Sequence, residues 1–66
     1  MIFKKTVIHQ SFCNRLNQID ERILIMCLKF KKQLDIFVLK NIYRGKNNSV
    51  YKFEFKQGSI CFQIQT

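Results

Sequence analysis

The last third of the chain alternates between apolar and polar side chains, which is typical of β-strands with one buried face. The apolar positions of the two runs are Tyr51, Phe53 and Phe55, and then Ile60, Phe62 and Ile64. A two-residue turn at Gln57-Gly58 places all six on one face and pairs Phe55 with Ile60, Phe53 with Phe62 and Tyr51 with Ile64. A three-residue turn would set Phe53 against Cys61. We therefore predict a hairpin in the first register, because burial selects the register.

Between Ser11 and Tyr43 the apolar spacing changes to that of a helix. Residues three or four positions apart form one stripe: Phe12, Leu16, Ile19, Ile23, Met26, Phe30, Leu34 and Phe37. Asp20 is a suitable cap for a second helix, with Glu21 near its positive end. The pattern predicts two helices, about 10–18 and 20–39, although residues 36–39 fit a strand equally well. Loop residues 44–49 follow, with Gly45 at the position after a helix C-terminus.

Residues 2–8 complete the predicted architecture. They are short and β-branched enough for a strand, with Phe3 and Val7 on one face and Lys5 between them. The element order is β-α(α)-ββ, an α+β fold in which the helices pack on one face of a small antiparallel sheet. Sixty-six residues are enough for one small domain, 1–66, with a stability of roughly 3–5 kcal/mol.

The chain is strongly basic. Twelve Lys and Arg residues against four Asp and Glu give a formal net charge of +8, and a charge of this size favours contact with polyanions such as RNA. The chain contains no alanine and is rich in Lys, Ile, Asn and Phe, a composition typical of an AT-rich genome. Part of the lysine excess is therefore attributable to codon bias as well as to function.

Cysteine and histidine usage predicts neither a disulfide framework nor a metal site. Cys13, Cys27 and Cys61 are odd in number and widely spaced, and His9 has no partner at metal-ligand spacing. We expect buried or half-buried thiols in a reducing compartment, the cytoplasm or an organelle matrix, and no metal or small-molecule cofactor. The longest apolar run covers residues 23–28, far short of the ~20 residues that cross a bilayer, so we expect no membrane partner.

Three segments resemble a known family. Residues 7–12 (VIHQSF) with Leu16 and Ile19 behind them, Tyr43-Arg44-Gly45, and residues 51–56 with 60–64 are similar to the first strand and helix, the Leu-Arg-Gly segment and the central hairpin of the RelE/ParE superfamily of toxin–antitoxin toxins. That superfamily includes ribosome-dependent messenger RNA endonucleases and gyrase inhibitors. The resemblance implies its fold and a surface that faces RNA or the ribosome. It also implies a protein partner such as an antitoxin peptide, which an exposed strand edge would suit.

Two departures from the family pattern bear on catalysis. Residues 59–62 lack the arginine that the second hairpin strand of the family usually carries, and the chain stops at Thr66 without the further strand that holds a catalytic Tyr or His. We interpret the fold as a C-terminally shortened RelE-like one. An enzymatic activity would be that of an RNA endonuclease, but His9 is the only side chain that titrates near neutrality and it has no identifiable carboxylate partner. We therefore expect RNA binding without cleavage.

Cations are the better candidates for a site, because Lys and Arg contact phosphates without reading sequence. Arg44 and Lys46 lie in the loop before the hairpin, and Lys52 and Lys56 are expected on the sheet face opposite the aromatic residues. A second group near the middle of the predicted second helix consists of Lys29, Lys31 and Lys32. The alternative interpretation of these lysines is a solvated face that keeps the chain soluble. For the aromatic residues of the hairpin, core packing is favoured over base stacking.

Three functions remain open on the sequence alone. The leading hypothesis is a RelE/ParE-like protein that binds RNA or the ribosome. The second is a small basic structural subunit of a ribonucleoprotein, of ribosomal type, from an AT-rich genome. The third is a phage or viral protein that binds a host factor, with its charge incidental.

Overall fold

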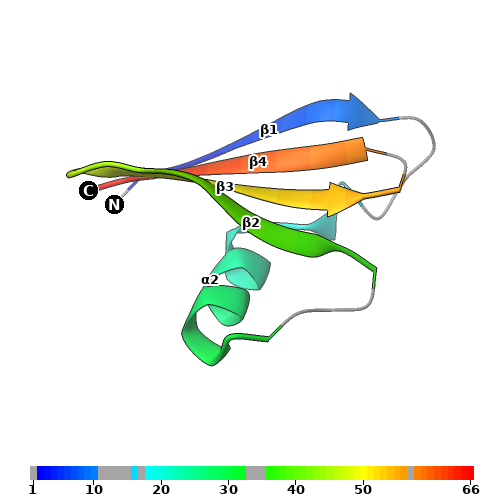
Figure 1. The fold of residues 1–66 in the computed structure, drawn as a ribbon, viewed down its shortest axis with the longest axis horizontal. Coiled ribbons are helices and arrows are strands. Elements are labelled where there is room, and N and C mark those ends of the chain that lie inside the picture. The colour runs from blue at the N-terminus through cyan, green and yellow to red at the C-terminus, as the bar shows by residue number, and fades with distance from the viewer. Residues whose placement is uncertain (1, 11–15, 17, 33–35, 57) are drawn as a thin grey trace.

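The structure of the chain is a computed structural model that describes residues 2–10, 16, 18–32, 36–56 and 58–66. Its elements run in the order β1 (Ile2–Gln10), α2 (Glu21–Phe30), β2 (Val38–Arg44), β3 (Asn48–Phe55) and β4 (Gly58–Gln65). The strands form one antiparallel sheet in the order β1-β4-β3-β2, and α2 lies on one side of it (Figure 1). The predicted α+β class is confirmed. Within the described segments, no helix has the length and apolar character needed to cross a membrane.

The predicted hairpin is present as β3 and β4, but its register differs by two residues. Phe53 lies opposite Ile60, Tyr51 lies opposite Phe62, and Phe55 pairs with Gly58, which belongs to β4 rather than to the turn. A shift of two keeps every side chain on its face, because side chains alternate with period two. The apolar pattern therefore cannot distinguish the two registers. β1 also pairs with β4 as far as Gly58, which places that glycine in the ladder.

The helix predicted over residues 20–39 is wrong beyond Phe30. Lys31 adopts the left-handed conformation (φ 53°, ψ 37°) that ends many helices, and the chain then returns as β2. The strand alternative for residues 36–39 is correct from Val38 onward. Gly45 does not follow a helix; it lies in the β2–β3 turn and donates its N–H to the Asn48 carbonyl at 2.7 Å. Pairing with β3 has overridden the helical spacing of this segment.

The first predicted helix, residues 10–18, falls largely outside the described residues. Its first residue, Gln10, is the last residue of β1.

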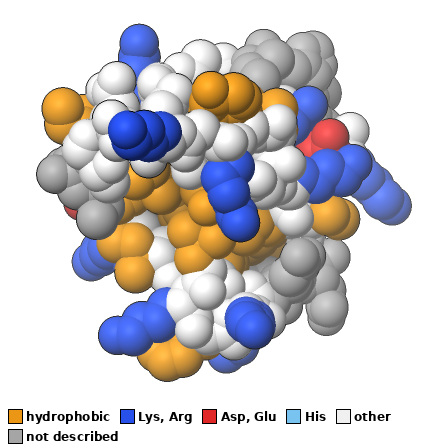
Figure 2. All heavy atoms as spheres, turned by 60° about the vertical axis from the view of Figure 1, so that its left-hand side comes forward, with side chains coloured by type: hydrophobic (Ala, Val, Ile, Leu, Met, Phe, Trp, Pro, Cys, Tyr) orange, Lys and Arg blue, Asp and Glu red, His pale blue; other side chains and the backbone are white. Residues whose placement is uncertain are grey.

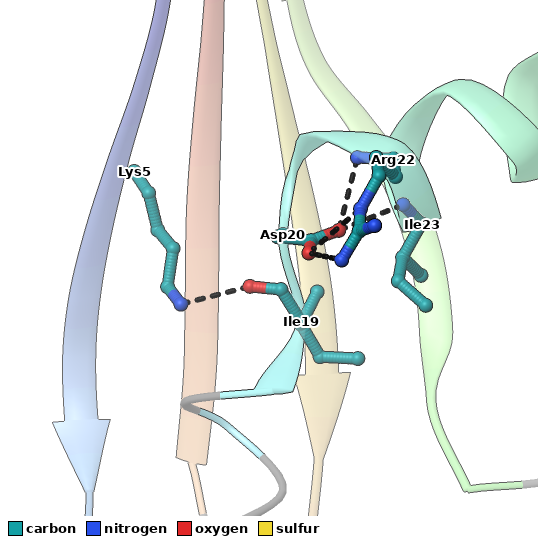
Figure 3. A network of polar contacts seen from close by, with 5 residues as sticks. All are labelled: Lys5, Ile19, Asp20, Arg22 and Ile23. Atoms are coloured by element: carbon teal, nitrogen blue, oxygen red, sulfur yellow. Dashed lines mark hydrogen bonds and ion pairs between the residues drawn. The ribbon is translucent and has the colours of Figure 1, made fainter.

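The predicted cap of the second helix is confirmed (Figure 3). Asp20 Oδ1 accepts hydrogen bonds from the backbone N–H of Arg22 at 3.0 Å and of Ile23 at 3.2 Å. The Arg22 guanidinium lies 3.1 Å from Asp20 Oδ2. The side-chain hydrogen bond from Arg22, assisted by the backbone N–H of Ile23, holds the pKa of Asp20 below its ordinary value.

The core lies between α2 and the adjacent face of the sheet. It consists of Leu16, Ile19, Leu24, Cys27, Phe37, Phe53, Ile60 and Phe62. The helix buries Leu24 and Cys27 rather than the whole predicted stripe: Ile23 is only partly buried, and Phe30 is 67% exposed. Phe30 is the last residue of α2, so the predicted apolar stripe of the helix ends at this residue.

Lys5 lies among the core-facing positions of β1, between Phe3 and Val7 as predicted, and pairs with Phe62. Its ammonium group donates to the Ile19 carbonyl oxygen at 2.8 Å, just before the cap of α2 (Figure 3). A lysine on this face thus ties the first strand to the start of the helix.

Candidate nucleic-acid interface

Figure 1 shows the side of the sheet that faces away from α2, here called the open face. By register, this side carries most of the polar side chains of the strands. Among the side chains that the structure describes, register places fourteen residues on it: Ile2, Lys4, Thr6, Val38, Lys40, Tyr43, Asn48, Val50, Lys52, Glu54, Ser59, Cys61, Gln63 and Gln65. In the described part of the chain, no helix or strand lies over these residues. Among the described residues, the open face therefore combines three lysines with one carboxylate, and all of its side chains except the buried Ser59 keep part of their surface exposed.

Two of these lysines are direct cross-strand partners. Lys40 of β2 lies opposite Lys52 of β3, and like charges directly opposite each other destabilise a sheet. Glu54, two residues along β3, accepts from both, at 2.9 Å from Lys40 Nζ and 3.4 Å from Lys52 Nζ. The hydrogen bond from Lys40, with a smaller effect of Lys52, lowers the pKa of Glu54. One carboxylate thus serves two ammonium groups, and the cluster keeps one net positive charge.

The structure does not bring the seven predicted cations together. Lys52 lies on the open face as predicted, whereas Lys56 lies in the turn after β3 rather than on the sheet. Arg44, predicted in a loop over residues 44–49, is instead the last residue of β2 and pairs with Ser49 of β3. Lys46 lies in the β2–β3 turn, as predicted. The group predicted at the middle of a helix lies at its end: Lys29 is in the last turn of α2, and Lys31 and Lys32 follow it. Of the seven, Lys52 alone has a described position on the open face.

Three candidate residues of the open face were missed from the sequence: Lys4 on β1, and Lys40 and Tyr43 on β2. The apolar spacing assigned β2 in part to a helix, and the available signal for it was the β-branched and aromatic content of residues 36–43. Tyr43 reaches the open face through a bulge: Asn41 pairs with Tyr51 on the core side, but Tyr43 pairs with Val50 on the open side. Ile42 is the extra residue between them.

A second surface lies at the end of the molecule where the chain termini meet. A hollow of about 370 Å³ is lined by Phe3, Ile25, Leu28, Lys29 and Ile64. Figure 2 shows hydrophobic side chains in the middle of this end of the molecule, with Lys and Arg side chains around them. The hollow offers apolar contact and a single cation, and it has no second polar side chain to orient a ligand.

The remaining reactive groups are thiols. Cys27 is buried and burial raises its pKa, whereas Cys61 is half-buried on the open face; both are free, and Cys13 lies outside the described residues. Across the described ranges, no three His, Cys, Asp or Glu side chains are close enough to hold a metal ion. The chemistry that the open face supports is the binding of anions by ammonium groups. The chain matches no protein-family model, no curated protein and no solved structure.

Proposed function

We propose that this chain is an RNA-binding protein of the RelE/ParE-like type, which acts by holding RNA or ribosomal RNA on the open face rather than by cleaving it. The observation that carries the proposal is the Lys40–Lys52 pair. Two like charges lie directly opposite on an uncovered sheet face with one carboxylate between them. A phosphate group bound there would supply the second negative charge that the protein lacks.

The rest of the chain supports a polyanion as the ligand. The formal net charge is +8, and two of the four acidic residues, Asp20 and Glu54, are already engaged in ion pairs with Arg22, Lys40 and Lys52. Few carboxylates are left to repel a phosphate backbone. The resemblance of residues 7–12, 43–45 and 51–64 to RelE/ParE toxins favours RNA or the ribosome among polyanions.

Binding without cleavage is favoured by the side chains of the open face. Those that the structure describes are ammonium groups, hydroxyls, amides, a thiol, aliphatic groups and one carboxylate held between two lysines. General acid–base cleavage needs a positioned proton donor and acceptor, and the arginine that the family pattern places in residues 59–62 is absent. In a translating extract with added protein, messenger RNA should stay intact while RNA co-purifies with the protein. Site-specific cleavage would contradict this part of the proposal.

The test of the proposed site is the salt dependence of RNA affinity in two variants of equal charge. Lys40→Gln/Lys52→Gln removes two charges from the open face, and Lys29→Gln/Lys32→Gln removes two from the end of α2. Each phosphate contact with a single strand contributes a slope of about −0.7 in log K against log salt. The open-face variant should therefore lose roughly 1–1.5 units of slope. The helix variant should lose much less, and the opposite ranking would place the RNA on the helix end.

A further inference from the structure

The bulge in β2 determines where Tyr43 lies. In regular alternation from Leu39 and Asn41, Tyr43 would share their side of the sheet, which faces α2. The extra residue, Ile42, reverses the alternation and pairs Tyr43 with Val50 on the open face. A large aromatic side chain that the core could have used is placed on the uncovered side, where it is 54% exposed.

Two neighbours hold this arrangement. The Asn41 side-chain amide donates to the carbonyl oxygens of Tyr43 and Val50, each at 3.2 Å, and so bridges the bulge to β3. The tyrosine ring packs over Gly45: a Cβ at that glycine would lie 2.7 Å from Tyr43 Oη and 2.8 Å from Cε1. The ring therefore occupies space that any other residue at position 45 would need. The Tyr43 ring is thus packed against Gly45, and part of its surface remains exposed to solvent.

The surroundings of the ring are cationic. Along the open face, the Val50–Gln63–Lys4 row continues from Tyr43, and the next row contains Lys40 and Lys52. Alternate residues of a strand are roughly 7 Å apart, so the row of Lys40 and Lys52 lies roughly 7 Å from the row of Tyr43. A single nucleotide can span this distance. An exposed aromatic ring beside lysines is the arrangement with which sheet surfaces bind unpaired nucleotides, the base on the ring and the phosphate on the cations.

We propose that Tyr43 is a base-stacking residue of the open face and that its ligand is an unpaired RNA strand. This inference rests on the proposed function and specifies that the RNA bound is single-stranded. A duplex keeps its bases stacked on one another, so its contact with this surface is limited to phosphates and sugars. Only a single strand can place a base on the ring.

The experiment compares a ten-nucleotide oligouridylate with an abasic oligomer and a duplex of equal length. Tyr43→Leu should weaken binding of the single strand by about 5- to 150-fold, the range found when a stacking side chain is removed. Its salt slope should not change, because no phosphate contact is lost. Tyr43→Phe keeps the ring and should restore the affinity. Neither substitution should alter the affinity for the abasic oligomer or the duplex.

A spectroscopic measurement on a chain with intact Tyr43 gives a second readout, which stays decisive should Tyr43→Leu fail to fold. The sequence contains two tyrosines and no tryptophan, so Tyr51→Phe leaves Tyr43 as the only strong fluorophore. Oligouridylate should quench this emission and the abasic oligomer should not. An unquenched Tyr43, or a Tyr43→Leu variant with unchanged affinity for the single strand, would overturn the inference and leave the proposed function standing. A chain with no salt-dependent RNA affinity would overturn both.

Discussion

The rings of Phe53 and Phe62 meet edge to face with centroids 5.6 Å apart, although neither residue is the direct cross-strand partner of the other. Both are fully buried. Phe37, just before β2, makes a second edge contact with Phe53 at 4.6 Å between centroids. Phe53 therefore connects the segment that enters β2 with the two strands of the hairpin, and it is the aromatic centre of the core.

Replacement of this centre should unfold most of the protein. Phe53→Ala removes a fully buried ring and should cost roughly 3–5 kcal/mol, which is comparable to the whole stability expected for a domain of this size. Urea denaturation followed by circular dichroism measures the change. Lys52→Ala, the neighbouring residue on the open face, should change the free energy of unfolding by no more than about 0.5 kcal/mol. An unaltered denaturation curve for Phe53→Ala would show that the ring does not contribute to the core.

The buried side of α2 can be tested with two apolar residues of the same helix. Leu24 is fully buried, and Leu24→Ala should cost about 2–5 kcal/mol. Phe30 is 67% exposed, and Phe30→Ala should cost no more than about 0.5 kcal/mol, even though the larger side chain is removed. Equal losses in the two variants would contradict the orientation of the helix.

Local patterns in the sequence predicted the parts of the fold that depend on neighbouring residues. Strict alternation in residues 51–64 gave the hairpin and the buried side of both strands, and Asp20 gave the start of α2. Alternation has a period of two, however, so it could not separate the observed pairing of Phe53 with Ile60 from a pairing with Phe62. In the observed register Gly58 is paired on both sides, with Phe55 of β3 and with Gln10 of β1, and the second of these pairings is distant in sequence.

The extent of β2 and the composition of the open face are determined by contacts between residues distant in sequence, which local patterns do not reveal. The spacing of Phe30, Leu34 and Phe37 continued the helical stripe, but the edge of β3 was available to pair with residues 38–44. The strand alternative in the sequence covers only residues 36–39, so it does not identify Lys40 as the partner of Lys52. The position of Tyr43 depends on the bulge, and the amide of Asn41 that bridges it contacts a carbonyl nine residues away. Lys52 was identified because it lies in the segment with the clearest pattern.

Asp20 should make stability sensitive to acid. Its pKa is lowered in the folded chain by the hydrogen bond from Arg22 and then by that from the Ile23 N–H. A lowered folded pKa stabilises the protein above the unfolded pKa of about 3.9, and this contribution is lost as the pH falls through the folded value. Asn is as good a cap but does not titrate. Asp20→Asn should therefore keep the melting temperature near pH 7 and reduce its decline in acid, whereas Asp20→Ala should lower it at both pH values.

Glu54 offers a test in which RNA binding becomes stronger. Glu54→Gln and Glu21→Gln each raise the net charge by one, but Glu54 lies between Lys40 and Lys52 whereas Glu21 lies in the first turn of α2. With RNA on the open face, Glu54→Gln should tighten binding several-fold at low salt, because two lysines lose their internal partner. Glu21→Gln should change it little. Equal effects would indicate attraction by net charge alone, with no contribution from the open face.

Cys61 reports directly on whether the open face is covered. It lies opposite both Lys52 and Thr6, half-buried, whereas Cys27 is buried in the core with a raised pKa. N-ethylmaleimide should modify Cys61 faster than Cys27, as measured by mass spectrometry of the two peptides. With single-stranded RNA at ten times its dissociation constant, the rate at Cys61 should fall about tenfold, because only about a tenth of the protein is then free. Cys27 should react equally slowly with and without RNA.

In Lys40→Gln/Lys52→Gln the protection of Cys61 should disappear at the same RNA concentration. A bound complex in which Cys61 reacts at its free rate would show that the RNA lies on another surface.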